Sequence, residues 1–298
     1  MQKPIKLITL YTHICESYKN ELQWEVKRFS PNGNIGQITD EELLTIYLFC
    51  TMYEQKTTKR AMYEHIIDYW HSWFPALPSY KNFSVRLNNL VEAFQLLLSL
   101  SMEEFELSAD KIPILIGDSM PVITCSHKRR ARVAPDLADK SYCATKNLHY
   151  FGVKIHALNL HRKTQLPFPV KIGITPASAP DITTLRPVLE VTHVQAVFLD
   201  KAYCDKNLKL KMKQNENELL TPIKKMKGVS AALNQFDKAA NDLFSTAVST
   251  IRQPIESFFN WIQEKTKIQI ASKVRSKSGL LVHIYAKLVA SVLMLLQF

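Results

Sequence analysis

The feature that most constrains the fold of this chain is a change in hydrophobic spacing near residue 108. Before it, apolar residues recur at helical spacing, as in "ITDEELLTIYLFCTMYEQ", where Thr39 and Glu42 form a capping-box signature. After it, short apolar runs and alternating segments are typical of strands, as in "LHYFGVKIHALNL" from Leu148. The sequence therefore predicts a mixed α/β chain, with an all-helical domain over residues 1–108 and a sheet-containing domain over residues 109–298.

The second domain is expected to hold five strands flanked by helices. The predicted strands are "KIPILIGDS", "LHYFGVKIHALNL", "LPFPVKIGITPAS", "AVFLD" and "LLTPIK". Helices are predicted at "DITTLRPVLEV", at "KNLKLKMKQNENE" and from Pro254, because proline suits the first helical position. Residues 229–250 are ambiguous and are read as a possible insertion, whereas Ser79 is expected to start one long helix in the first domain, "YKNFSVRLNNLVEAFQLLLSL".

The charge balance points to a polyanionic partner. Lysine and arginine total 38 against 27 acidic residues, a formal charge of +11, which favours nucleic acid over a membrane surface. The five cysteines form no C-x-x-C pair and suit reduced thiols rather than a disulfide framework. A zinc site at Cys125, His127, Cys143 and His149 is conceivable, but its irregular spacing favours buried or incidental residues.

The C-terminal segment "LLVHIYAKLVASVLMLLQF" is the only candidate for a membrane span. His283 and Lys287 interrupt it, and too few apolar residues follow them to cross a bilayer. It is therefore read as a buried final helix. Because no signal peptide is evident either, a cytoplasmic protein with no membrane partner is expected.

Three carboxylates are the candidate catalytic residues. Asp118 and Asp200 each stand where an apolar strand is expected to end, and a right-handed crossover between parallel neighbours would bring both to one end of the sheet. Glu256 lies four residues after Arg252, so the two can share one helix face. Each carboxylate also has a structural alternative: Asp200 as a helix cap, Asp118 as the cap of a turn before Pro121, and Glu256 as a stabilising charge at a helix start.

Carboxylates with few other ligands suit magnesium or manganese, which keep several waters and accept phosphate oxygens. Two such ions can assist in-line displacement at phosphorus, which fits a basic protein acting on a phosphodiester backbone. Basic residues near these carboxylates are candidate DNA contacts, although each lysine is equally well explained as surface charge. They are Lys128, Arg129, Arg130 and Arg132 in "HKRRAR", Lys201, and Lys224, Lys225 and Lys227.

An ordered series of motifs resembles that of the DDE transposases of bacterial insertion sequences. In chain order these are "IGDSMPV", "YFGVKIH", "ITPASAPD", "FLDKAY", "LLTPIKKMKG" and "IRQPIESFFNWI". The likeness covers about residues 110–298 and, more loosely, the helical start from Thr39 through "WFPALPSYKNF". It implies a ribonuclease-H-like catalytic fold, Asp118, Asp200 and Glu256 as the metal-binding triad, and Arg252 as a contact to DNA near the reacting phosphate.

The resemblance implies an enzyme that nicks the ends of a mobile element and joins the freed 3′-hydroxyl to target DNA, with two Mg²⁺ or Mn²⁺ ions in the active complex. Its expected partners are the terminal inverted repeats, the target DNA and a second protomer, in a bacterial cytoplasm at the nucleoid. The helical domain would bind element ends or hold protomers together. The alternatives are a nuclease of the same fold and an inactive DNA-binding descendant. Family members often carry glycine, tyrosine and lysine where Ala202, Ser249 and Gln263 stand here.

Overall fold

The computed structural model describes residues 2–26, 38–105, 113–126, 133–143, 147–189, 194–223 and 238–298, and its contacts form two compact units. The helical unit comprises Met1–Glu106, Ile123–Ala138 and Ile262–Phe298. The sheet unit comprises Leu107–Val122 and Asp139–Trp261. By contacts, the last helix therefore groups with the N-terminal helices, whereas the sequence places it with residues 109–298. The functional boundary near residue 108 stays a prediction.

The helical unit contains the predicted N-terminal helices, with one difference. The single helix expected from Tyr80 is two helices, because the chain leaves helical geometry at Asn89 and Leu90. Asparagine is a weak helix former, and the Asn88 side chain accepts a hydrogen bond from Lys59 at 2.5 Å. The elements are α1 (Lys3–Ser17), the π-helix η1 (Tyr18–Leu22), α2 (Gln23–Glu25), α3 (Asp40–Met52), α4 (Lys59–Tyr69), α5 (Tyr80–Asn88), α6 (Val91–Glu103) and α12 (Lys277–Leu295).

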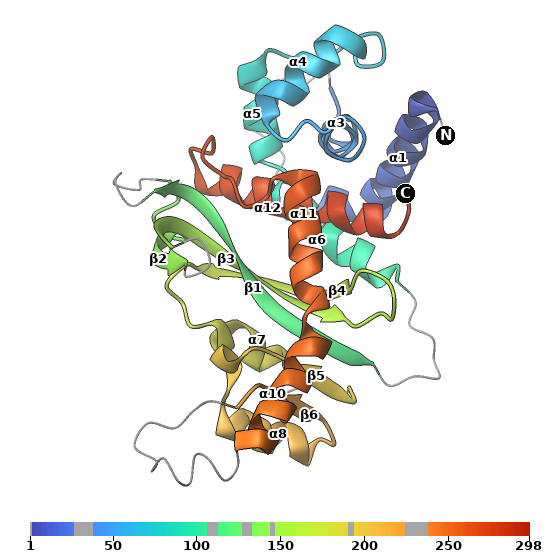
Figure 1. Cartoon of the computed structure of the whole chain (residues 1–298). Helices are drawn as coiled ribbons and strands as arrows, with labels where there is room; N and C mark the ends of the chain where they lie inside the picture. Colours follow the sequence, from blue (N-terminus) through green and yellow to red (C-terminus); the bar gives the residue numbers. More distant parts are fainter. Residues whose placement is uncertain are drawn as a thin grey trace. The chain divides into compact units, whose positions relative to one another are not determined.

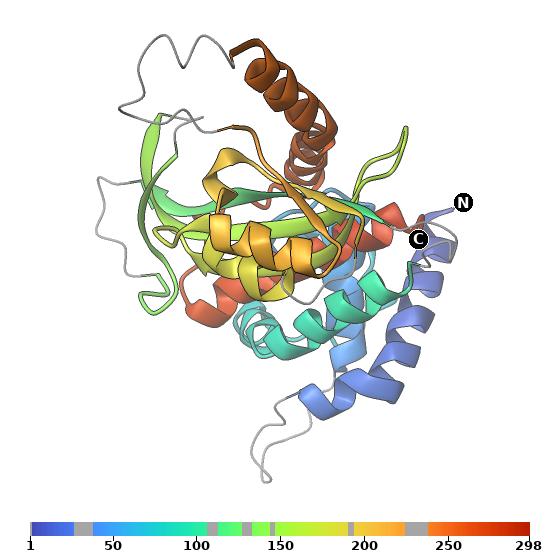
Figure 2. The ribbon, with the colours of Figure 1, turned by 90° about the horizontal axis from the view of Figure 1, so that it is seen from below.

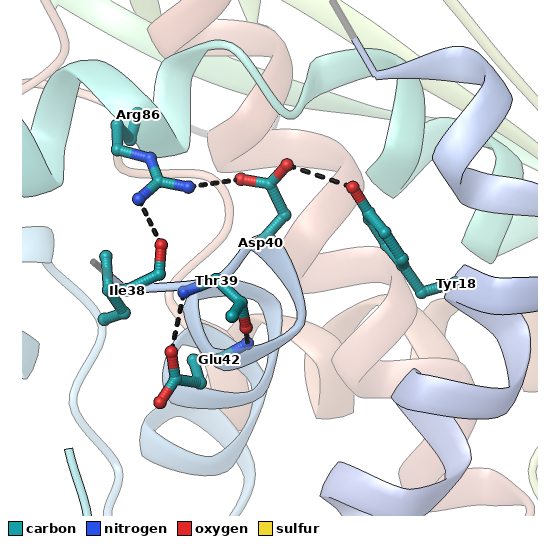
Figure 3. Close-up of polar contacts among 6 residues, drawn as sticks. All are labelled: Tyr18, Ile38, Thr39, Asp40, Glu42 and Arg86. Atoms are coloured by element: carbon teal, nitrogen blue, oxygen red, sulfur yellow. Dashed lines mark hydrogen bonds and ion pairs between the residues drawn. The ribbon is translucent and has the colours of Figure 1, made fainter. Parts of the chain in front are cut away.

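The start of α3 is fixed by the predicted capping box. Thr39 accepts a hydrogen bond from the Glu42 backbone at 3.2 Å, and the Glu42 side chain accepts one from the Thr39 backbone at 2.6 Å (Figure 3). Two of the backbone N–H groups that lack a partner at a helix start are thereby satisfied. The expectation from the sequence is confirmed here. The Ser79 side chain, in contrast, makes no capping hydrogen bond, although α5 does begin after it.

Arg86 links α5 to the start of α3. Its guanidinium donates to the Asp40 carboxylate at 2.7 Å and to the Ile38 carbonyl, and Asp40 also accepts from the Tyr18 hydroxyl at 3.1 Å (Figure 3). Because Arg86 and Asp40 are both largely covered, this ion pair is less screened than one at the surface. Arg86 therefore ties helices together in the helical unit.

We expect Arg86→Met to lower the free energy of unfolding by about 1–3 kcal/mol, since it leaves Asp40 and the Ile38 carbonyl without their donor. Urea unfolding followed by circular dichroism measures this loss. Arg60→Met is the matched control, because Arg60 forms an exposed pair with Glu64 one helical turn away, worth about 0.3–0.5 kcal/mol. Its guanidinium also lies over the Tyr80 ring, 5.0 Å from the ring centroid, a contact worth about 0.5–1 kcal/mol at an exposed site. Equal losses in the two variants would contradict the linking role of Arg86.

The last helix, α12, is the centre of the helical unit and packs against α3, α5 and α6. Figure 1 shows it beside α6. By length and composition α12 could cross a membrane, yet 72% of its most apolar window is buried inside the protein. The prediction of a buried final helix is confirmed.

The buried polar side chains of α12 include two ionisable ones, His283 and Lys287. The His283 ring is 2.8 Å from the Ile268 carbonyl, and the Lys287 ammonium lies 3.5 Å from the Lys267 carbonyl. Burial lowers the pKa of Lys287 to about 7 and that of His283 to about 3, because the charged forms lose their hydration.

The sheet unit is built on a mixed sheet in the order β2-β3-β1-β5-β6, with β4 paired to β3. Figure 2 shows this curled sheet from below. Six strands are present among the described residues, one more than expected: β2 has only five residues and no long apolar run, so it carries little strand signal. The strands are β1 (Ile114–Ser126), β2 (Asp139–Cys143), β3 (Leu148–Leu160), β4 (Phe168–Pro176), β5 (Ala196–Phe198) and β6 (Glu218–Leu220).

The pairing of β1 with β5 determines which residues meet at the middle of the sheet. These two strands are parallel, with Ile116 opposite Phe198, and β5 is also parallel to β6. The strands β2 and β4 run antiparallel to successive halves of β3. Parallel and antiparallel pairs in one sheet, together with the helices that flank it, confirm the predicted mixed α/β fold.

Helices cover the sheet and carry part of the candidate site. Within this unit α7 packs against β3 and β4, α8 against β6, and α10 against β5. The predicted apolar face of α11 is confirmed, since Ile255, Phe258, Phe259 and Ile262 are all buried. The helical elements are α7 (Asp181–Leu189), the 3-10 turn η2 (Lys201–Tyr203), α8 (Lys206–Gln214), α10 (Lys238–Arg252) and α11 (Pro254–Thr266). Residues 229–237 of the suspected insertion lie outside the described residues.

Candidate active site

Asp118 lies inside a strand, not at the end of one. The sequence predicts that the apolar run stops at this residue, but β1 continues through Pro121 to Ser126. Pro121 is tolerated because β1 pairs with β5 only over Ile114–Ile116, so the missing N–H removes no bond to that neighbour. The side chain of Asp118 is 25% exposed, so its carboxylate is largely covered but still reaches solvent.

Asp200 follows β5 at the position that corresponds to Asp118. Ile116 pairs with Phe198, and two further residues along each chain bring Asp118 and Asp200 to matching positions beyond the last paired residues. The negative charge of Asp200 is close enough to raise the pKa of Asp118. The predicted parallel neighbours are thus confirmed, and they place both aspartates on one part of the sheet.

The alternative explanation of Asp200 as a helix cap is wrong. Asp200 precedes the turn η2, but its side chain makes no capping hydrogen bond. The following helix, α8, is capped instead by Asp205, which accepts the Leu208 N–H at 2.9 Å. Helix capping therefore does not explain why a carboxylate stands at position 200.

Glu256 and Asp118 are joined by one arginine. The Arg252 guanidinium is 2.5 Å from Asp118 Oδ2 through Nη1 and 2.9 Å from Glu256 Oε1 through Nη2. Arg252 is the last residue of α10 and Glu256 is in the first turn of α11, with the helix interrupted between them at Gln253, directly before Pro254, which has no N–H to donate. The side chain of Arg252 is only 13% exposed, whereas that of Glu256 is 56% exposed.

The Asp118 carboxylate is largely shielded from water. Burial raises its pKa to about 6, because a carboxylate loses hydration there, and the neighbouring charge of Asp200 adds to the rise. Arg252 and the Ser119 N–H, which donates to Asp118 Oδ1 at 2.8 Å, act in the opposite direction. The site therefore contains a carboxylate that requires a nearby cation in order to stay ionised.

The donor set of this site suits a hard divalent cation. Asp118 and Glu256 supply oxygen ligands, and the Arg252 guanidinium already holds a positive charge between them. Among the described residues no group of three or more His, Cys, Asp or Glu side chains lies close enough together to hold a metal ion. The Arg252 guanidinium thus lies between Asp118 and Glu256 and pairs with both. The same search finds no zinc cluster around Cys125, Cys143 or His149; His127 lies outside the described residues.

A buried tyrosine, Tyr203, belongs to this site and was not singled out from the sequence. Its N–H donates to the Asp200 carbonyl at 3.0 Å, which holds the turn η2 against the end of β5. The phenol is fully buried. Burial raises its pKa, followed by the charges of Asp181 and Asp118. An aromatic residue three positions after a strand-end aspartate, as in "FLDKAY", is the signal that could have found it.

An open groove of about 430 Å³ runs along α10 to Glu256. Hydroxyl groups dominate its lining beside Arg252 and Glu256; they belong to Ser245, Thr246, Ser249 and Thr250. Hydroxyls can donate to phosphate oxygens without adding charge.

The remaining predicted contacts are placed only in part. Lys201 is exposed in η2, directly after Asp200. The other basic candidates lie outside the described residues: Lys128, Arg129, Arg130, Arg132, Lys224, Lys225 and Lys227.

Comparison with known families decides the identity. A family model described as "Transposase DDE domain" matches residues 109–293. The chain belongs to this family of DDE transposases. A search of curated proteins gave no match. The mixed sheet flanked by helices agrees with the ribonuclease-H-like fold of a DDE domain, and the family acts on DNA in transposition. The resemblance drawn from the ordered motifs is confirmed at the level of the family.

Proposed function

We propose that this transposase cleaves DNA at the ends of a bacterial insertion sequence and joins the freed 3′-hydroxyl to target DNA, using Mg²⁺ or Mn²⁺. The observation that carries the proposal is the meeting of Asp118 and Arg252, 134 positions apart, with Glu256 on the same guanidinium. Three elements of the sheet unit contribute to this arrangement, β1, α10 and α11. Asp200 enters from the end of β5, the strand parallel to β1.

Asp118, Asp200 and Glu256 would hold the two ions. When bound, these ions lower the pKa of the attacking water or hydroxyl and stabilise the charge on the departing 3′ oxygen. The Ser119 N–H fixes one oxygen of Asp118 and thereby orients the other. Water or a 3′-hydroxyl makes the attack, so no serine or tyrosine of the chain has to act as nucleophile.

The surroundings of the carboxylates would position the DNA strand. The hydroxyl-lined groove on α10 ends at Glu256 and offers donors to phosphate oxygens. Lys201 is exposed beside Asp200, and the proposal assigns the same role to Lys128, Arg129, Arg130 and Arg132 and to Lys224, Lys225 and Lys227. It also gives Arg252 a DNA phosphate as its partner in the complex, as the family resemblance implies.

The helical unit would recognise element ends or bring two protomers together. Its first helix supports the second role, because Ile5, Ile8 and Tyr11 are exposed and recur at helical spacing on α1. A homodimer would hold two element ends in one synaptic complex. The proposal places this complex in the cytoplasm, at the bacterial nucleoid, where the DNA substrate lies.

A strand-transfer assay tests the proposed function. Labelled duplexes from both ends of the DNA segment that carries the coding sequence would be incubated with the protein, a target plasmid and Mg²⁺ or Mn²⁺. Products in which the labelled 3′ end is joined to the plasmid are expected. Cleaved ends without joined products would favour a nuclease of the same fold, and binding without cleavage would favour an inactive DNA-binding descendant.

We expect Arg129→Ala with Arg130→Ala to weaken DNA binding at low salt and to flatten its salt dependence. The slope of log K against log[salt] should fall by about one unit for each phosphate that the protein no longer neutralises, because fewer counterions are released on binding. Fluorescence anisotropy on a labelled duplex between 50 and 200 mM KCl, roughly the range over which this effect is large, gives the slope. An unchanged slope would remove both arginines from the DNA interface.

A further inference from the structure

We propose that Arg252 is a positioning residue that competes with the divalent cation for Asp118 and Glu256 and sets the metal affinity of the site. This inference rests on the proposed function, because it takes these carboxylates as metal ligands. Its starting point is that one guanidinium contacts two of the three predicted ligands, at 2.5 Å and 2.9 Å. A guanidinium is always positively charged, so Arg252 already neutralises the carboxylates that a metal ion would otherwise neutralise.

The contacts make simultaneous occupation unfavourable. Asp118 Oδ2 is held by Arg252, and Asp118 Oδ1 already accepts the Ser119 N–H. A magnesium ion needs carboxylate oxygens at about 2.0–2.1 Å in octahedral geometry. Each of these oxygens keeps a second lone pair, so Arg252 opposes a metal ion by repulsion between two cations that share the same carboxylates. Metal binding to both Asp118 and Glu256 is therefore favoured when Arg252 releases at least one of them.

Release of Arg252 has a cost that a DNA phosphate would offset. Its side chain is largely covered, and its Nε has no hydrogen-bond partner among the described residues. A covered guanidinium that loses its carboxylates needs another anion. Arg252 also lines the open groove beside Glu256 together with Ser249 and Thr250, so the side chain has an open space into which it can turn. A phosphate bound in that groove would give it a new partner.

When Arg252 exchanges its carboxylates for a DNA phosphate, the binding of metal and the binding of DNA become coupled. Binding of DNA should increase the affinity for metal, and by linkage metal should increase the affinity for DNA to the same factor. Without DNA, Arg252 keeps Asp118 and Glu256 paired with itself and the site binds metal weakly. This competition would restrict the metal-bound, reactive state to protein that has already bound DNA.

Mn²⁺ binding measured by electron paramagnetic resonance of the free ion tests this without any reaction. In the absence of DNA we expect Arg252→Gln to bind Mn²⁺ at least fivefold more tightly than the wild type. Arg252→Lys keeps the charge but cannot contact both carboxylates in a fork, so it should fall between the two. A random-sequence duplex should tighten Mn²⁺ binding by the wild type and have a smaller effect on Arg252→Gln.

The controls separate this inference from the proposed function. Arg60→Gln removes an arginine with the same four-residue spacing to a glutamate, Glu64, on an exposed helix face, and it should leave Mn²⁺ binding unchanged. Asp118→Asn combined with Arg252→Gln should abolish the gain. Equal or weaker Mn²⁺ binding by both Arg252 variants, while Asp118→Asn still abolishes binding, overturns the competition and leaves the metal site standing. If Mn²⁺ binding is unchanged when Asp118, Asp200 and Glu256 are replaced by their amides, the proposed function is overturned as well.

Discussion

Asp200→Asn and Asp118→Asn are each expected to reduce metal-dependent DNA cleavage by roughly 10³-fold or more, a loss of about 4 kcal/mol of transition-state stabilisation. An amide keeps the size of the side chain but removes the negative charge that a divalent cation requires. Asp200 is the sharper test, because its side chain makes no capping bond whose loss could disturb the fold. In the absence of divalent metal, the DNA affinity of Asp200→Asn should change by no more than about twofold, since this aspartate contributes no positive charge to the interface.

Cleavage of a labelled duplex and anisotropy on the same duplex give the two quantities. Asp242→Asn is the matched control, as Asp242 is exposed on α10 and outside the candidate site. For the third carboxylate, Glu256→Gln is compared with Glu264→Gln, an exposed glutamate on the same helix. Wild-type cleavage by either aspartate variant would refute the assignment of the site.

Lys287→Met is expected to stabilise the protein at pH 6 by several kcal/mol and to lose this advantage as the pH rises. Burial lowers the pKa of Lys287 to about 7, far below the value of about 10.4 for an exposed lysine. Between these two pH values the unfolded chain binds a proton that the folded chain does not, so wild-type stability rises with pH. Methionine has similar length and no charge, and its advantage over lysine should therefore shrink by about 1.4 kcal/mol for each pH unit above 7.

Urea unfolding at pH 6, 7.5 and 9 measures this difference. Lys277→Met is the matched control, because Lys277 begins the same helix and is exposed. Its effect should be small at every pH. A Lys287→Met variant that is less stable than the wild type at pH 6, or whose stability difference does not depend on pH, would contradict the account of a lysine buried without a compensating carboxylate.

Local patterns in the sequence were sufficient for most of the framework. The five expected strands are present, because alternating or continuous apolar runs over several residues reflect burial directly. The capping box at Thr39 and the apolar face of α11 also follow from residues that are near one another in the chain. The short strand β2 was missed because its five residues contain no long apolar run. The break between α5 and α6 was missed because Asn88 is held there by Lys59, a partner distant in sequence.

The chain by itself determined its family and most of its elements and indicated the three acidic positions as candidates, because each of these depends on residue type and local spacing. Tertiary structure alone decided that Asp118 lies within a strand, that Tyr203 is buried beside the aspartates, and that Arg252 is held between Asp118 and Glu256. These arrangements depend on strand register and on the meeting of β1 with α10 and α11. The contact between Arg252 and Asp118 joins residues 134 positions apart, and no local periodicity encodes it.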